Sequence, residues 1–157
     1  MKSFFAPGKL LILGEYAVLF GYPCIVTAVN KRIFVIIEQV ESGVVYDVPS
    51  SSDTRFLQAA LEEFKGYYRR EVKNIRITTH SEFDEISGLG SSAAVVVATI
   101  GALAQFYEKK LSKQELFDIS IKAVHAVQGN GSGADVAASV YGGVVWYAQG
   151  KDIEILS

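Results

Sequence analysis

The sequence predicts a mixed α+β domain. Three observations support this prediction: runs of Val and Ile in the first half of the chain, apolar residues at helical spacing in the second half, and two glycine-rich loops that each precede an apolar helix. The chain has 157 residues, of which 50% are hydrophobic, so it is long enough to bury the core of one domain.

The first half of the chain is rich in strand-forming residues, interrupted by short turn signals. The expected strands are 3–6, 10–13, 24–29, 32–40 and 44–48. Pro7-Gly8 predicts a turn between the first two strands, and Asn30-Lys31 predicts a bend between the next two. Loops are expected at 14–16 and 20–23.

Helices are predicted from the middle of the chain onward, and two of them have recognisable starts. Ser50-Ser51-Ser52-Asp53 is an N-cap cluster, and Ser112-Lys113-Gln114-Glu115 is a capping box. The predicted helices are 54–68, 91–106, 113–127 and 134–140. Strands are expected at 72–79, before the second helix, and at 143–147, after the last one.

Composition excludes several classes of function. The net charge is −2, so no broad attraction for nucleic acid is expected. Cys24 is the only cysteine, which excludes an internal disulfide, favours a reducing cytoplasm and suggests a small buried apolar residue. The N-terminus lacks the apolar core of a signal peptide, and 95–103 is shorter than the roughly 20 residues that span a bilayer, so no membrane segment is expected.

Residues 88–94, Gly-Leu-Gly-Ser-Ser-Ala-Ala, are the most informative segment. Glycines allow close approach of the backbone to an anion, and the free N–H groups of the following helix carry the positive end of its dipole. The hydroxyls of Ser91 and Ser92 have three possible roles: capping the helix, binding a phosphate oxygen or ligating Mg²⁺. The pattern is neither a Walker motif nor a clean Gly-x-Gly-x-x-Gly.

Three charged or titratable residues lie beside turns and are candidates for phosphate chemistry. Lys9 either neutralises phosphate charge or is an ordinary solvated lysine. Asp135 either serves as a base and partner of Lys9 or is a first-turn carboxylate favoured by the helix dipole. His125 is either a substrate contact or a cation at a helix C-terminus. His80 has no partner at metal-ligand spacing, so zinc is not expected.

Two segments together resemble the motifs of the GHMP kinases, a group that includes galactokinase, homoserine kinase, mevalonate kinase and phosphomevalonate kinase. The segment 7–19 resembles the first motif, and 88–94 resembles the ATP-binding second motif. Their order and separation also fit the family. The resemblance covers essentially the whole chain and implies a ribosomal-protein-like α/β fold, with a mixed sheet and helices on one side.

Within the family, the segment 127–138 is similar to phosphomevalonate kinases, which carry a Gly-Ser-Gly-x-Asp-Val-Ala pattern there. Mevalonate kinases more often carry Pro-Ser-Gly-x-Asp-Asn, and they have a Mg²⁺-binding glutamate where this chain has Val124, with no acid nearby until Asp118. Residues 81–87 also lack the proline that many members carry before Gly-Leu-Gly. These differences favour the phosphomevalonate branch, and therefore ATP-dependent phosphorylation of 5-phosphomevalonate to 5-diphosphomevalonate in isoprenoid synthesis.

The resemblance also implies roles for individual residues. Lys9 would act on the acceptor phosphate and the transition state, with Asp135 opposite it, and Ser92 would help to bind Mg²⁺. The residues implied for the ATP phosphates are Gly88, Leu89, Gly90, Ser91, Ser92 and Ala93. The residues implied for substrate are Lys9, Tyr16, His125, Gly131, Ser132 and Gly133.

Family members are about twice as long as this chain, so residues 1–157 are expected to form an N-terminal ATP-binding domain. A C-terminal domain, in the same or another chain, would supply a third glycine-rich motif and one wall of the cleft, and the isolated chain is expected to have weak or no kinase activity. Other functions stay open: a mevalonate kinase, a sugar kinase, a nucleotide-sensing module without catalysis, or a nucleic-acid-binding domain of the ribosomal-protein type, which the net acidity disfavours.

Overall fold

The long strand β2 (Cys24–Gln39) organises the sheet, because it pairs along both of its edges. In the computed structural model, which describes residues 1–50, 52–84 and 87–157, β1 (Lys2–Leu13) pairs antiparallel with one edge. On the other edge, β4 (Ile75–Ser81) and β5 (Val144–Tyr147) pair antiparallel with successive parts of β2.

Two short strands complete the sheet and make it mixed. β3 (Val44–Asp47) is parallel to β4, and β6 (Glu154–Ile155) is antiparallel to β5. The predicted mixed α+β class is confirmed. β6 lacks a clear sequence pattern because it is only two residues long, and it was not predicted.

The prediction of four separate short strands in 3–40 is wrong, because 3–13 and 24–39 each form one continuous strand. The turn and bend signals instead mark an irregularity in the pairing. Pro7 pairs with Arg32, whereas Lys9 pairs with Ala28, so extra residues of β2 around Asn30-Lys31 bulge opposite Gly8. Pairing resumes on both sides of the bulge, which is why neither strand ends there.

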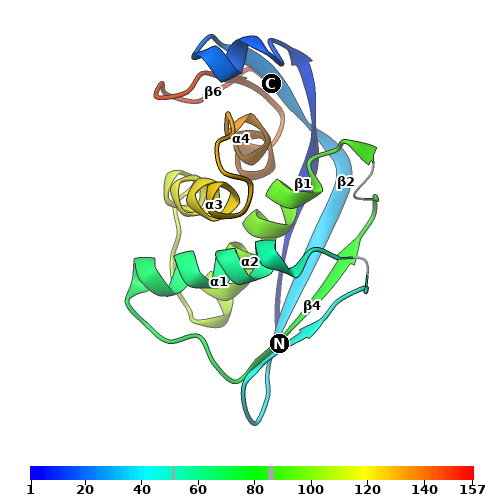
Figure 1. The fold of residues 1–157 in the computed structure, drawn as a ribbon, viewed down its shortest axis with the longest axis vertical. Coiled ribbons are helices and arrows are strands. Elements are labelled where there is room, and N and C mark those ends of the chain that lie inside the picture. The colour runs from blue at the N-terminus through cyan, green and yellow to red at the C-terminus, as the bar shows by residue number, and fades with distance from the viewer. Residues whose placement is uncertain (51, 85–86) are drawn as a thin grey trace.

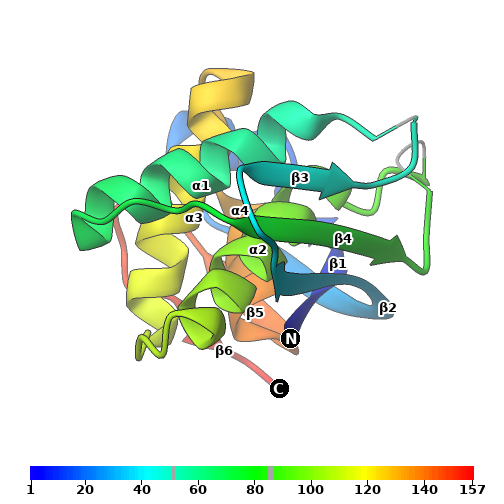
Figure 2. The ribbon, with the colours of Figure 1, turned by 90° about the horizontal axis from the view of Figure 1, so that it is seen from below.

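The helices all lie on one face of the sheet, as Figures 1 and 2 show from two directions. They are α1 (Thr54–Tyr68), α2 (Ser91–Phe106), α3 (Lys113–Gln128) and α4 (Ala134–Tyr141), with a short 3₁₀ helix, η1 (Ala17–Phe20), after β1. Their starts confirm the cap predictions. Asp53 accepts from the Arg55 N–H, and the Ser112–Glu115 capping box is complete. Ser51 of the predicted cap cluster lies outside the described residues.

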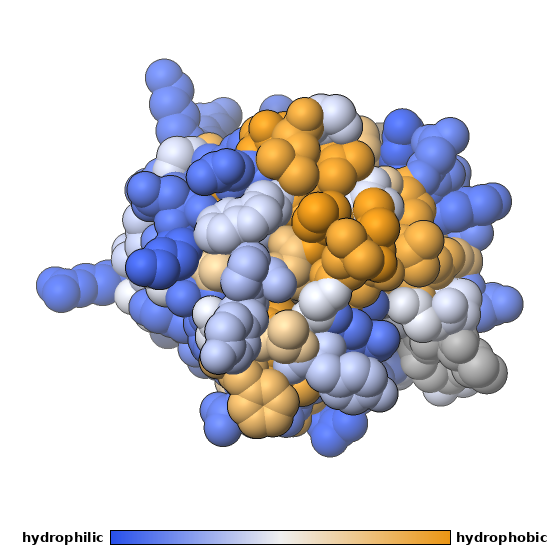
Figure 3. Space-filling model, turned by 90° about the horizontal axis from the view of Figure 1, so that it is seen from above, coloured by the Kyte–Doolittle hydropathy of each residue, from blue (hydrophilic) through white to orange (hydrophobic). Residues whose placement is uncertain are grey.

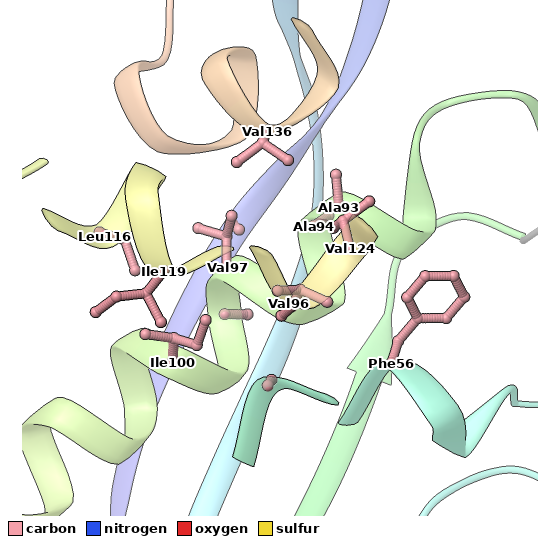
Figure 4. Packing of buried hydrophobic residues seen from close by; sticks show 14 of the residues in the cluster. Phe56, Ala93, Ala94, Val96, Val97, Ile100, Leu116, Ile119, Val124 and Val136 are labelled. Carbon is pink, nitrogen blue, oxygen red and sulfur yellow. The ribbon is translucent and has the colours of Figure 1, made fainter. Parts of the chain in front are cut away.

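The helix α2 forms the centre of the core. Its residues Val96, Val97 and Ile100 are fully buried and meet side chains from α3 and α4 (Figure 4). On the sheet side, a Cβ at Gly101 would collide with the Phe4 ring, so glycine there allows α2 to lie close to β1. The middle of α2 is therefore packed between the other helices and the sheet.

The cysteine lies where the sequence predicted it. Cys24 is buried at 2% exposure, and burial raises the pKa of its thiol, in agreement with a packed apolar role. In the described ranges of the chain, no helix combines the length and the apolar character needed to cross a membrane.

Candidate active site between two clefts

The first glycine motif and the second are in direct contact, although they are far apart in the sequence. The Lys9 N–H donates to the carbonyl of Leu89 over 2.7 Å. The stem of Lys9 lies against Gly90, where a Cβ would be only 2.8 Å from the lysine Cγ. A Cβ at Gly8 would likewise be 2.8 Å from the Leu89 oxygen. The part of β1 opposite the bulge and the turn before α2 thus form a single structure that requires glycine on both sides.

The turn before α2 is open to solvent. Gly90 is the N-cap residue, with φ +74°, and no described side chain makes a capping hydrogen bond to the helix start. Gly88 is exposed, and Ser91 and Ser92 are half-buried. The serines therefore do not serve as the cap. Among the residues that the structure describes, no side chain accepts from the amides of the first turn, and such a helix start favours an anion.

A cleft of about 540 Å³, which we call the serine-side cleft, begins at this turn. Ser91 and Ser92 line part of it, and apolar and polar residues share the remaining wall about equally. The other lining residues are Ile33, Pro49, Ser52, Asp53, Phe56, Leu57, Thr79, His80, Ser81, Phe83, Asp84 and Val95. Figure 4 shows Phe56 of α1 beside this end of α2. The helix start together with apolar side chains such as Phe56 and Leu57 suits a ligand that has both an anionic group and a flat apolar body.

A second cavity of about 180 Å³, which we call the lysine-side cleft, lies against β1, α3 and α4. It brings Lys9 and Asp135 to one site, together with His125. The other lining residues are Leu11, Glu15, Leu19, Ile121, Val124, Gln128, Gly131, Ser132, Gly133 and Val136. Among the ion pairs of the described residues, none joins Lys9 to Asp135. Both charges are therefore available to a ligand between them.

The second glycine loop is held from several sides. The carbonyl of Gly131 lies 3.1 Å from His125 Nε2, so this nitrogen carries the proton and donates. Tyr147 donates from its hydroxyl to the Ser132 carbonyl over 2.5 Å. Ser139 of α4 donates to the carbonyl of Pro7 over 2.9 Å, which ties the helix of Asp135 to the strand of Lys9.

The GHMP kinases N-terminal domain model matches residues 55–143, which is more than half of the chain. The chain belongs to the GHMP kinase family. The mevalonate kinase of Pyrococcus abyssi is 31% identical over 93% of this chain and 51% of its own length. A phosphomevalonate kinase from a Streptomyces species is also 31% identical, over 90% of this chain and 48% of its own length. This GHMP kinase domain therefore spans about half the length of the curated relatives it matches.

Solved structures support the same fold for this GHMP kinase domain. The mevalonate kinase of Methanococcus jannaschii superposes with a TM-score of 0.89 over 99% of this chain and 55% of its own, at 23% identity. The phosphomevalonate kinase of Streptococcus pneumoniae gives 0.83 over 94% of this chain and 48% of its own, also at 23% identity. The expected GHMP N-terminal fold, with its mixed sheet, is confirmed.

Most residues that the sequence singled out gather at the two clefts of this GHMP kinase domain. Of the second motif, Ser91 and Ser92 line the serine-side cleft, while the Ala93 side chain is fully buried in the core. Lys9, His125, Asp135 and the loop 131–133 line the lysine-side cleft. Tyr16 differs, because it is 76% exposed and lines neither cleft.

Sequence reasoning missed several lining residues. Glu15 and Leu19 lie within the first motif, so their position in the motif could have identified them as site residues. Asp53, Phe56 and His80 come from α1 and β4, which only the fold brings to the second motif. Tyr147 is not among the lining residues, but it supports the loop at Ser132 from the strand that was expected at 143–147.

Proposed function

We propose that this GHMP kinase domain holds ATP for phosphoryl transfer to a small acceptor. The observation that carries this proposal is the turn at 88–92. It is open, has no cap from a described side chain and lines the serine-side cleft, and the stem of Lys9, which lines the lysine-side cleft, packs against it. A donor phosphate chain on the α2 amides would reach from the serine-side cleft toward Lys9. Such positioning, together with charge neutralisation, is most of what phosphoryl transfer needs.

The serine-side cleft is the proposed place for the nucleoside. Phe56, Leu57 and Val95 offer an apolar surface for a base in the same cleft as Ser91 and Ser92. Family membership supports ATP as the donor. In addition, one structural neighbour, the phosphomevalonate kinase of Streptococcus pneumoniae, was solved in complex with phosphomevalonate and AMPPNP.

Magnesium would be held largely by the phosphates. Within the described parts of the chain, no group of three His, Cys, Asp or Glu residues could hold a metal ion. This fits Mg²⁺, which binds through one or two protein oxygens plus substrate phosphates and water. We propose Ser92 as the protein ligand. The ion would neutralise charge on the donor phosphates when bound.

The proposed acceptor is 5-phosphomevalonate. Lys9 and the His125-supported glycine loop surround the lysine-side cleft, and Val124 stands there in place of an acidic residue. A phosphate monoester has a second pKa of about 6, so it is ionised at neutral pH without a base. Asp135 would therefore act mainly as an orienting charge opposite Lys9. Mevalonate is the second candidate, because the relatives at about 31% identity include mevalonate kinases.

A substrate panel tests the proposal. The kinase that contains this domain would be assayed with ATP and Mg²⁺ on mevalonate, 5-phosphomevalonate, galactose and a heptose phosphate. We expect turnover of 5-phosphomevalonate in preference to the others. Turnover of mevalonate alone would show that the acceptor is mevalonate and not 5-phosphomevalonate. ATP binding without turnover of any acceptor would favour a nucleotide-sensing module.

The role of Asp135 has its own test. Asp135→Asn is expected to lower kcat with a flat pH profile above pH 7, because no proton has to leave the acceptor. Asp118→Asn, at an exposed position of α3, is the matched control. A steep pH profile in the unmodified enzyme that disappears in Asp135→Asn, with substrate binding unchanged, would show that Asp135 is a base.

We further propose that a C-terminal kinase half covers an apolar surface beside the lysine-side cleft. Figure 3 shows apolar side chains gathered at this end of the molecule. The exposed members are Leu10, Ile12, Leu13, Tyr16, Leu19, Phe20, Tyr22, Ile155 and Leu156. Leu19 also lines the cleft, so a domain that covers the surface would complete the acceptor site.

This surface can be tested with two charged substitutions. Leu19→Asp and Phe20→Asp are expected to reduce activity of the longer kinase while leaving the melting temperature of the 157-residue chain unchanged, because both side chains are exposed in the isolated domain (57% and 79%). Val45→Asp, at another exposed apolar position on β3, is the control. Full activity of both variants would place the second half elsewhere.

A further inference from the structure

Tyr147 is a buried polar residue directly beneath the second glycine loop. It belongs to β5, where it pairs with Cys24, and it is 3% exposed. Its hydroxyl donates to the Ser132 carbonyl over 2.5 Å, and its ring lies 6.1 Å from that of Phe117. A phenol in this position is satisfied by one specific backbone carbonyl, so it fixes the loop from the core side.

The loop is in close contact with this hydroxyl. Gly133 has φ +84°, and a Cβ at this position would lie 2.8 Å from the Tyr147 oxygen and 2.5 Å from Ile121 Cδ1. Ala134 N–H donates to Ser132 Oγ, and Ala137 N–H donates to the carbonyl of Gly133. The Ser132–Gly133 peptide is thus fixed on its carbonyl side by Tyr147 and joined on its other side to the first turn of α4.

A fixed carbonyl also fixes the amide of the same peptide. In a trans peptide, the N–H points opposite to the C=O. The Ser132 carbonyl points to Tyr147 in the core, so the Gly133 N–H points away from it, and Gly133 itself lines the lysine-side cleft. Asp135 follows at the second position of α4 and lines the same cleft.

We propose that Tyr147 is a positioning residue that holds the Ser132–Gly133 peptide with its N–H toward an anionic group of the acceptor. This inference rests on the proposed function, since it assigns the lysine-side cleft to the acceptor. Tyr147 does not touch the acceptor itself. Its hydroxyl acts through the loop and, by setting the start of α4, through the placement of Asp135. The charge of Asp135 contributes, after burial and Cys24, to the raised pKa of Tyr147, in agreement with their closeness.

The test compares Tyr147→Phe with Tyr141→Phe. Tyr141 also donates a hydrogen bond from a phenol, to Gln114, but it lies at the far end of α4. In Tyr147→Phe, we expect the ¹³C shift of the Ser132 carbonyl and the ¹⁵N shift of Gly133 to change. We also expect amide exchange in 131–136 to speed up. In the assay of the longer kinase, we expect kcat/KM for the acceptor to fall about three- to tenfold, with KM for ATP unchanged. Tyr141→Phe should change none of these.

Two outcomes would overturn the inference. One is an unchanged Ser132 carbonyl shift in a folded Tyr147→Phe variant. The other is a lowered melting temperature with equal losses for ATP and acceptor, which would indicate a structural role only. If Tyr147→Phe does not fold, the unmodified chain is titrated with inorganic phosphate instead. A Gly133 N–H that faces the lysine-side cleft is expected to show a shifted amide resonance when phosphate binds. If the Gly133 amide shifts with phosphate but the substrate panel fails, the proposed acceptor is rejected and the anion-binding loop is kept. If the Gly133 amide does not shift, the positioning role is rejected.

Discussion

The two glycine loops of this domain are built alike and held differently. Each ends in a glycine with positive φ that begins a helix, Gly90 at +74° before α2 and Gly133 at +84° before α4. The first loop is bound through its backbone to β1, and its other side is exposed to solvent. The second is fastened from below by the side chains of His125 and Tyr147.

The difference matches the different tasks that we propose for the two loops. A loop that offers its amides to a polyanion needs free N–H groups and no side chain in the way. A loop that aims one amide and one carboxylate at a small acceptor needs a fixed orientation, which buried hydrogen bonds provide. Substitutions at the residues that hold each loop should therefore have different effects on activity and on stability.

The largest effect is expected where the two clefts meet. Lys9→Met should lower phosphoryl transfer about 10²- to 10³-fold, because in the proposed site the cation would face charge that develops in the transition state. Steady-state kinetics on the longer kinase measure this loss. Lys122→Met, at an exposed position of α3, should leave the rate unchanged. A loss below about threefold would remove Lys9 from the transition state.

How closely the second loop is packed can be measured as the loss of unfolding free energy when a side chain is added to it. Gly133→Ala should destabilise the domain by about 2–4 kcal/mol, because it adds a collision with Tyr147 and Ile121 to the cost of positive φ. Gly21→Ala has nearly the same backbone angles and nothing within 4 Å of the new Cβ, so it should cost only about 1 kcal/mol. Urea unfolding of both variants gives the difference. Equal costs would mean that the second loop is not tightly held.

Alkaline pH should weaken the same fastening. Burial, with smaller contributions from Cys24 and Asp135, raises the pKa of Tyr147 to about 12 from 10.0. The folded state favours the neutral phenol, so its contribution is complete below pH 10 and is lost as pH rises through 12. Unfolding free energy should therefore fall by about 2–3 kcal/mol more in the unmodified chain than in Tyr147→Phe. Parallel curves for the two proteins would contradict a buried, hydrogen-bonded hydroxyl.

The smallest effect concerns the first loop. Gly90→Ala should cost about 1 kcal/mol more than Gly88→Ala and should weaken ATP binding further. Both positions have positive φ, but only Gly90 would place its Cβ against the Lys9 stem. Thermal unfolding and calorimetric titration with ATP measure the two costs. Equal losses of stability and of ATP affinity in the two variants would show that the Lys9 side chain moves aside at no cost.

Local signals in the sequence identified most of the domain, because each acts over a few residues. The Ser112 capping box, the Asp53 cap and the apolar spacing of 54–68 and 91–106 predicted helices that the structure has. The strands were found but divided, since Pro7-Gly8 and Asn30-Lys31 are turn signals that pairing with a distant strand turned into a bulge. β4 was expected from residue 72 and begins at Ile75.

The sequence by itself determined the two glycine turns, the helices that follow them and the residue types suited to phosphate, because backbone preference and helix capping are local. Only the tertiary structure decided which of these residues meet. It laid the Lys9 stem on Gly90, brought Phe56 and His80 to the start of α2, and placed the Tyr147 hydroxyl under Ser132. These contacts depend on sheet pairing and helix packing between segments far apart in the chain, and no short sequence pattern encodes them.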